Sequence, residues 1–150
     1  MPQSFTCLHY HIVFSTKDRR PTIADDICER LYKYIGGSLS ENKSRLVAVG
    51  GMSDHIHLLA SMSKELSISD ALRVIKTNSS KWVHETFPKH SAFAWQAGYA
   101  AFAVSFSNLD TVRRYIADQE THHRRVDFKT EFMTLLTRHE IEFEEKYLWD

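Results

Sequence analysis

The sequence contains few cysteines, glycines and prolines, and it has no long apolar run. Its two cysteines, Cys7 and Cys28, lack the spacing of a metal-binding or disulfide-rich domain, so we expect free thiols in a reducing compartment. Five glycines and three prolines form no linker or low-complexity stretch, and we place no domain boundary within residues 1–150. No apolar run approaches the roughly 20 residues of a membrane-spanning helix, and the first residues lack the charged start and apolar stretch of a signal peptide. These absences predict a single cytoplasmic domain without a membrane segment.

The chain also lacks net charge, because 19 lysines and arginines balance 19 aspartates and glutamates. The two signs are unevenly distributed. Residues 1–126 carry 16 basic against 12 acidic side chains, whereas residues 127–150 carry 3 against 7. A mildly basic body can bind phosphate groups locally, but ordinary scatter of surface charge explains the same counts. Charge alone therefore does not predict a nucleic-acid partner.

The hydrophobic patterning predicts four strands and four helices. We expect strands at 8–15, 45–52, 55–62 and 95–106, and helices at 25–41, 67–87, 108–123 and 127–139. A tight turn at Ser53 and Asp54 joins the second and third strands as a hairpin. The order of the elements predicts an α+β fold, a ferredoxin-like two-layer sandwich in which helices pack on an antiparallel sheet. Such a fold serves many functions and predicts none of them.

His55, Ile56 and His57 lie in the third expected strand. Side chains alternate across a sheet, so both imidazoles project from one face and provide half of a divalent-metal site. The alternative is a pair of exposed polar positions, and we expect replacement of both histidines to leave the fold intact. His9 and His11 repeat the same spacing in the first strand, so the spacing alone does not select the metal-binding pair.

Tyr115 and Gln119 are separated by four residues in an expected helix. Positions i and i+4 lie about 40° apart around a helix axis, so both side chains share one face. Taken alone, Tyr115 is equally well explained as an aromatic at the edge of the core, and Gln119 as a solvated helix residue.

Several short motifs occur in a fixed order over residues 9–123. They are His11–Arg20 (HIVFSTKDRR), Asp54–Leu59 (DHIHLL), Trp95–Tyr99 (WQAGY) and Val112–Ile116 (VRRYI), followed by Gln119. Together they resemble the single-tyrosine HUH transposases of the IS-two-hundred type, in which HUH denotes His–hydrophobe–His. The combination is much more specific than any of its parts.

The resemblance implies an activity and a set of site residues. His55, His57 and Gln119 would bind magnesium or manganese, and Tyr115 would attack DNA to form a covalent 5′-phosphotyrosine. The expected enzyme cleaves and rejoins single-stranded DNA with hairpin ends, without ATP. The resemblance also implies a homodimer, in which the histidine pair of one subunit can combine with the tyrosine helix of the other.

Two basic groups are candidates for binding the DNA backbone. The first, on one face of the second expected helix, contains Arg73, Lys76 and Lys81, and the second contains Lys17, Arg19 and Arg20. A solvated helix face explains the first group equally well. His122, one turn beyond Gln119, is a weaker candidate for contact with the metal or phosphate.

Three alternative functions are compatible with parts of this pattern. A domesticated relative would use the same nicking chemistry on genomic repeat hairpins. A non-catalytic module that binds single-stranded nucleic acid would need neither Tyr115 nor a metal. A metal phosphodiesterase without a covalent intermediate leaves Tyr115 beside Gln119 unexplained.

Overall fold

The computed structural model describes residues 3–150, which fold around a four-stranded antiparallel sheet. The strands are β1 (His9–Ser15), β2 (Arg45–Met52), β3 (His55–Ser61) and β4 (Ala100–Val104). Their spatial order is β2-β3-β1-β4, and each neighbouring pair is antiparallel. This order, with a helix after β1 and another after β3, is the ferredoxin-like arrangement, and the predicted α+β fold is confirmed.

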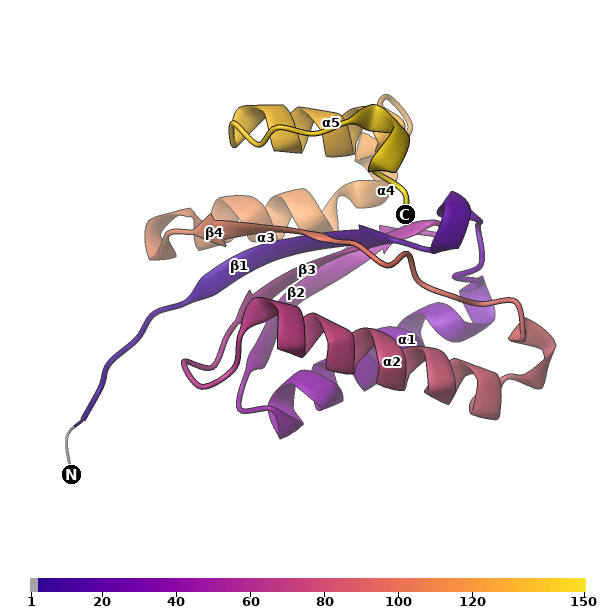
Figure 1. Ribbon diagram of the computed structural model, residues 1–150, viewed down its shortest axis with the longest axis horizontal. Coiled ribbons are helices and arrows are strands. Elements are labelled where there is room, and N and C mark those ends of the chain that lie inside the picture. The colour runs from indigo at the N-terminus through magenta and orange to yellow at the C-terminus, as the bar shows by residue number, and fades with distance from the viewer. Residues whose placement is uncertain (1–2) are drawn as a thin grey trace.

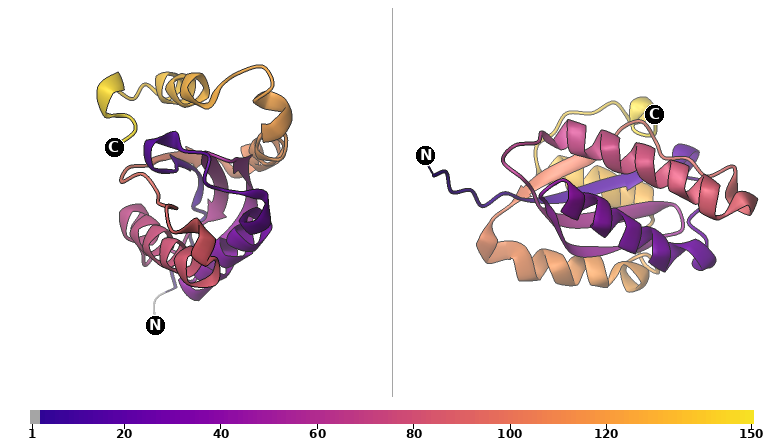
Figure 2. Two further views of the ribbon diagram at one scale, coloured as in Figure 1. Left: turned by 90° about the vertical axis from the view of Figure 1, so that its right-hand side faces the viewer. Right: turned by 90° about the horizontal axis from the view of Figure 1, so that it is seen from below.

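Helices cover both faces of the sheet (Figures 1 and 2). α1 (Asp25–Glu41) and α2 (Ile68–Thr86) pack on one face, while α3 (Leu109–Ala117), α4 (Gln119–His122) and α5 (Phe128–Arg138) lie on the other. Short 3-10 helices are η1 (Lys17–Arg19), η2 (Pro88–His90), η3 (Phe106–Asn108) and η4 (Glu145–Tyr147). The expected two layers thus gain a third. Among the described residues, no helix combines the length and apolar character required to span a bilayer.

Alternation along the strands divides the buried side chains into two clusters. Ile12, Phe14 and Leu58 point to the α1/α2 face and belong to the larger core. Val13 and Phe102 point to the opposite face, where they pack against a smaller cluster supplied by α5. The site described below lies on the side of the smaller cluster.

The strand predicted at 95–106 is shorter than expected. Regular pairing begins at Ala100, and Trp95 forms only an isolated bridge with Thr16. The Gln96 side-chain oxygen accepts a hydrogen bond from the Ser15 N–H (2.6 Å), so a side chain takes the place of a backbone partner there. Polar side-chain contacts of this kind are not visible in a hydrophobic pattern.

The helix predicted at 108–123 is divided at Asp118 into α3 and α4. Asp118 leaves the helical region (φ −93°, ψ 18°). Its N–H still bonds to Arg114 O (3.0 Å), and its oxygen accepts from the His122 N–H (2.9 Å). The two helices are therefore linked by hydrogen bonds across the break.

Gly50 in β2 allows α3 to approach the sheet closely. A β-carbon at this position would clash with the backbone oxygen of Ile116. The absence of a side chain therefore sets the distance between β2 and the helix that carries Tyr115.

Candidate active site

His55 and His57 project from β3 toward the α3–α5 side of the sheet. Both side chains are completely buried, so the alternative that they are a pair of exposed polar positions is wrong. α5 covers the face on which they lie, and this packing could not be predicted from the pattern of the strand alone. Replacing either histidine therefore removes a buried hydrogen-bonding group.

Each imidazole is oriented by a partner on its Nδ1 atom. Asp54 Oδ1 lies 2.7 Å from His55 Nδ1, and His11 Nε2 lies 2.8 Å from His57 Nδ1. Both Nε2 atoms consequently face the interior of the site, as expected for metal-binding histidines oriented by outer partners. Of the competing pair in β1, His11 is one of these partners, whereas His9 lies next to Cys7.

Gln119 enters the site from α4 and is buried. Its Oε1 atom lies 3.2 Å from His55 Nε2. When the proton of neutral His55 resides on Nδ1, facing Asp54, the Nε2 atom carries a lone pair. With the amide oriented in this way, two acceptors face each other, and a cation between them would satisfy both. The donor set therefore fits a metal ion.

Glu131 of α5 occupies the centre of the site and was not predicted from the sequence. Its side chain is 2% exposed. Its carboxylate lies 3.0 Å from His57 Nε2, 3.2 Å from Gln119 Nε2 and 3.2 Å from His123 Nε2. In the sequence, Glu131 shares one helix face with Phe128, Phe132 and Leu135. An ionisable residue on that apolar face is the signal that could have identified it.

Four side chains form a group that can hold a divalent cation. They are His55, His57, His123 and Glu131, whose candidate ligand atoms all lie within 4.8 Å of one another. Imidazole nitrogens with a carboxylate oxygen are common ligands of divalent transition metals. His123, rather than the predicted His122, faces this group. His122 Nε2 is 3.2 Å from Glu131 but lacks hydrogen-bond geometry.

Tyr115 lies beside the metal-binding group, on α3. Its hydroxyl donates a hydrogen bond to Glu131 Oε2. Its ring meets those of His57 and His11 edge-on, with centroid separations of 5.8 Å and 6.0 Å. Burial, followed by the hydrogen bond to Glu131, raises the pKa of Tyr115 above its usual value. The hydroxyl is therefore protonated in this arrangement.

The buried charges favour neutral imidazoles around one carboxylate. Burial lowers the pKa of His57, an effect that Glu131 opposes, and burial likewise lowers the pKa of His123. Burial raises the pKa of Glu131, but hydrogen bonds from His57 and Tyr115 outweigh it, and the net pKa lies well below normal. We conclude that Glu131 is ionised and that the histidines are available as metal ligands.

The predicted basic residues of α2 lie on the opposite side of the sheet from this site (Figure 1). Arg73 pairs with Asp70 at 3.1 Å and Lys81 with Glu85 at 3.9 Å, on exposed surfaces where such pairs are weak. Lys76 is different, because its ammonium donates to the carbonyl oxygens of residues 96, 97 and 98. Burial lowers the pKa of Lys76 to about 8. This lysine holds the connection before β4 and is not free to bind phosphate.

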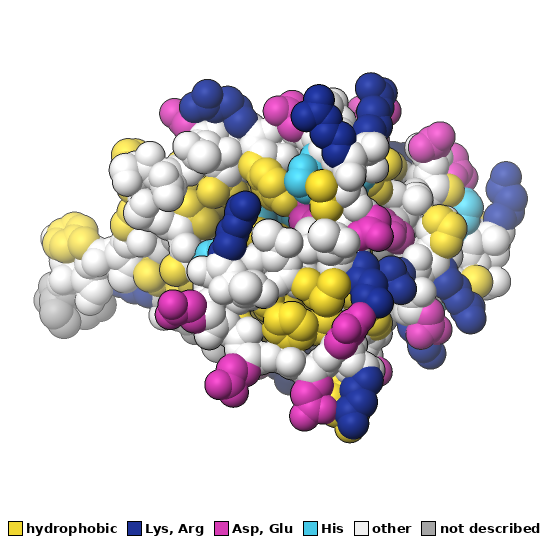
Figure 3. All heavy atoms as spheres, turned by 90° about the horizontal axis from the view of Figure 1, so that it is seen from above, with side chains coloured by type: hydrophobic (Ala, Val, Ile, Leu, Met, Phe, Trp, Pro, Cys, Tyr) yellow, Lys and Arg dark blue, Asp and Glu magenta, His cyan; other side chains and the backbone are white. Residues whose placement is uncertain are grey.

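The second basic group lies closer to the site. It follows Ser15, the β1 residue that pairs with His55. Lys17 is exposed, the guanidinium of Arg19 stacks on Trp149 (4.7 Å), and Arg20 lies 3.9 Å from Asp18. On the face that carries α5, basic and acidic side chains are interspersed and histidines reach the surface only in small patches (Figure 3).

Comparisons with known proteins bear on this arrangement. Residues 4–119 match a family model described as "Transposase IS200 like". The chain is 22% identical over 117 residues to the ISDra2 transposase TnpA of Deinococcus radiodurans, with 75% of this chain and 84% of that protein covered.

Two solved structures are similar in fold. One is a putative transposase from Deinococcus radiodurans, with a TM-score of 0.62, 24% identity and coverage of 79% of this chain and 98% of that chain. The other is a REP-associated tyrosine transposase bound to a REP hairpin, with a TM-score of 0.61, 16% identity and coverage of 84% and 74%.

Proposed function

Because the chain belongs to the IS200-like transposase family, we propose that it is a metal-dependent enzyme that cleaves and rejoins single-stranded DNA through Tyr115. One observation carries this proposal beyond the family. Tyr115, His57 and Gln119, from three different elements, all contact the carboxylate of Glu131. A nucleophile and candidate metal ligands are thus next to each other within one chain.

His55, His57 and Gln119 are the proposed metal ligands, with Glu131 and His123 completing the set. A bound divalent cation supplies charge neutralisation on the scissile phosphate and on the leaving 3′-oxygen. Magnesium prefers oxygen ligands, whereas manganese belongs to the first-row series of metals that bind mixed nitrogen and oxygen sites, although it binds them more weakly than the later members. The nitrogen-rich group therefore favours manganese over magnesium.

The proposed reaction forms one bond and breaks one. The Tyr115 oxygen attacks phosphorus in line, a 5′-phosphotyrosine forms, and the DNA 3′-oxygen leaves and takes up a proton. The phenolic proton passes to an acceptor, and Glu131 Oε2 is the acceptor that the hydroxyl already faces. Rejoining reverses the sequence, so the phosphodiester energy is retained and ATP is not needed.

The contact between Tyr115 and Glu131 also sets a condition on substrate binding. The two side chains touch directly, and both histidine ligands are fully buried. The hydrogen bond between Tyr115 and Glu131 must therefore break before a phosphate can reach the hydroxyl.

We propose single-stranded DNA bearing a hairpin as substrate and a homodimer as the functional assembly. The similar REP-associated tyrosine transposase, which is bound to a REP hairpin, supports the choice of substrate. The same similarity supports cleavage of genomic repeat hairpins as a second candidate function. Contacts to the DNA backbone would come from Lys17, Arg19 and Arg20 near the site, and from Arg73 and Lys81 on α2.

The decisive experiment detects the covalent intermediate. Protein, manganese and end-labelled single strands from the DNA flanking the gene are mixed, and a denaturant-resistant adduct is sought by gel electrophoresis. Tyr115→Phe should abolish the adduct and keep DNA binding, whereas Tyr147→Phe, a change at an exposed tyrosine, should leave both intact. An adduct with Tyr115→Phe would show that another residue attacks. Binding without any adduct would favour a non-catalytic module.

A further inference from the structure

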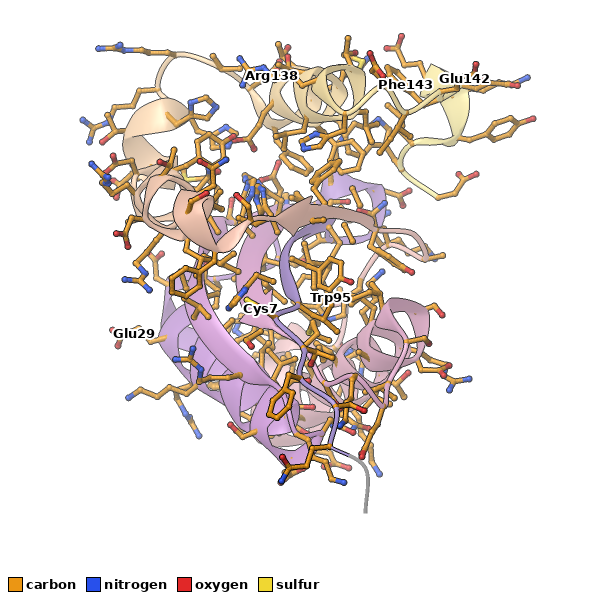
Figure 4. All side chains as sticks on the ribbon, turned by 90° about the vertical axis from the view of Figure 1, so that its left-hand side faces the viewer. Cys7, Glu29, Trp95, Arg138, Glu142 and Phe143 are labelled. Carbon is orange, nitrogen blue, oxygen red and sulfur yellow. The ribbon has the colours of Figure 1, made fainter. Side chains whose placement is uncertain are left out.

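A cavity of about 450 Å³ opens beside Tyr115, between β4, α3 and the end of α5. We call it the tyrosine cleft. Tyr115 and Thr111 line it from α3, Phe102 from β4, and Leu135 and Arg138 from α5. Its volume is within the range of small-molecule sites, roughly 300–1,000 Å³. Figure 4 shows Arg138 on α5, on the other side of the sheet from Trp95 and Glu29.

The chemistry of the cleft suits an anion that carries a flat, partly apolar ring. No aspartate or glutamate lines it, and among residues 3–150 Arg138 forms no salt bridge. Phe102 is buried and stacks with His139 at a centroid separation of 4.1 Å, so the exposed imidazole of His139 is the aromatic surface that this pair presents to the cleft. The hydroxyl of Thr111 and the amide of Asn108 add hydrogen-bonding groups.

A second cavity lies beside α2 and differs from the tyrosine cleft because its basic side chains already have partners. It is lined by Arg73, Lys76 and Trp95. However, Lys76 is bound to backbone carbonyls and Arg73 to Asp70. This cavity also does not include the nucleophile, so nothing in it connects a ligand to the reaction.

We propose that the tyrosine cleft binds the nucleotide whose 5′-phosphate becomes joined to Tyr115, the first nucleotide on the 3′ side of the cleaved bond. This inference rests on the proposed function. A nucleotide attached to Tyr115 must occupy space next to that side chain, and the cleft provides it. The base lies against the apolar and aromatic wall, and Arg138 neutralises a backbone phosphate.

The inference is tested by binding, in the absence of metal so that no strand is cut. The position of cleavage is first mapped from the covalent adduct. Fluorescence anisotropy then compares the intact strand with strands that lack one base, either at the first position 3′ of the cleaved bond or at a position several nucleotides away. The proteins are the wild type, Thr111→Trp, which fills the cleft, and Thr137→Trp, an exposed position of α5 outside it.

Base–aromatic stacking predicts that removing the first base weakens wild-type binding about tenfold. Thr111→Trp should weaken binding of the intact strand by a similar factor and become insensitive to loss of that base. Thr137→Trp should behave like the wild type. Arg138→Ala should weaken binding of both strands, whereas Arg45→Ala, a change at an exposed arginine on β2, should not.

The outcomes separate the two proposals. If an adduct forms at Tyr115 but removal of the first base weakens binding equally in the wild type and in Thr111→Trp, the proposed role of the cleft is overturned and the proposed function is not. Insensitivity of the wild type to that base would do the same. Failure to obtain any adduct would overturn the proposed function, and the cleft with it.

Discussion

Glu131 connects the candidate metal-binding group to Tyr115, the proposed nucleophile, through a single carboxylate. One oxygen faces His57 and His123, while the other accepts from Tyr115 and Gln119. A change at this residue is therefore expected to affect both metal binding and Tyr115. Burying a charge is costly unless it has hydrogen-bonding partners. A glutamate on an otherwise apolar helix face is therefore explained by these partners and not by packing.

We predict that Glu131→Gln weakens manganese binding by about 10- to 100-fold, because a neutral amide replaces an anionic oxygen in the group. Isothermal titration calorimetry of the metal-free protein measures this directly. Glu120→Gln, a change at an exposed glutamate on α4, is the matched control and should bind manganese like the wild type. Unchanged or tighter binding by Glu131→Gln would mean that the carboxylate occupies the site without holding the metal.

A second prediction concerns the stability of the metal-free protein in acid. Burial, followed by the charge of His57, lowers the pKa of His11 to about 3, compared with 6.5 for a histidine in an unfolded chain. Between these values the unfolded chain binds the proton and the folded chain does not. The contribution is therefore fully present above about pH 6.5 and is lost as the pH falls.

When the pH falls from ~7 to ~5, protonation of His11 in the unfolded chain alone should lower the free energy of unfolding by about 2 kcal/mol. The groups that face it are His57 of β3, Tyr115 of α3, and Glu131 and His139 near α5. His57 acts in the same direction because its pKa is also lowered, and Glu131 adds its own loss only below about pH 4.5. Urea unfolding with a chelator tests this. His11→Gln should reduce the pH dependence, and His84→Gln, at an exposed position, should not. Equal stability at both pH values would refute the assignment of neutral buried histidines.

At the scale of elements, the distance between α3 and β2 positions Tyr115, the proposed nucleophile. Gly50→Ala should push α3 away, because its β-carbon would meet the Ile116 backbone. Such overpacking costs about 1–3 kcal/mol, and it should reduce adduct formation more than DNA binding. Gly37→Ala is the matched control, because open space surrounds that helical position. It should be neutral or slightly stabilising. Thermal unfolding and the adduct assay report both effects, and full activity of Gly50→Ala would contradict the argument.

The elements predicted most accurately were those whose hydrophobic pattern depends only on residues nearby in the sequence. The helix at 25–41 and the strand at 45–52 match α1 and β2 because alternation and helical spacing are local properties. The strand before α3 was predicted too long because Lys76 donates to the backbone carbonyls of residues 96–98, and the Gln96 side chain accepts from the backbone N–H of Ser15 in β1. Such contacts depend on residues far away in the sequence.

The site was predictable only in part, because its short motifs can be read from the sequence and the packing of distant segments cannot. His55 and His57, with Tyr115 and Gln119, were selected by motif, and the structure brings these four side chains together. Glu131 was missed because only the packing of α5 brings it to β3. His123 was missed because helical spacing did not show that it, rather than His122, turns inward at the end of α4. The burial of His55 and His57 was missed as well, because a single strand does not reveal whether a helix from a distant segment covers it.

At the scale of the whole molecule, the C-terminal part of the chain contributes to the candidate site through α5. The family model ends at residue 119, and α5 lies beyond it. α5 nevertheless supplies Glu131 and one wall of the tyrosine cleft, and His123 at the end of α4 also lies beyond residue 119. Of the acidic residues at 127–150, Glu131 is the one buried in the site, and the others are exposed.

Assembly of the site within one chain leads to the last prediction. Tyr115 lies beside His57 of the same chain and contacts the same Glu131. Sharing of sites between subunits, which the resemblance implies, is therefore not needed to bring these groups together. A His55→Ala/His57→Ala protein is mixed with a Tyr115→Phe protein under conditions that permit subunit exchange, and adduct formation is measured. We expect no adduct, because every chain then lacks either the ligands or the nucleophile. Light scattering must show a dimer in the same sample, since a monomer would give the same negative result and contradict the proposed homodimer. Return of the adduct in the mixture, with neither variant active alone, would show that α3 exchanges between subunits during catalysis.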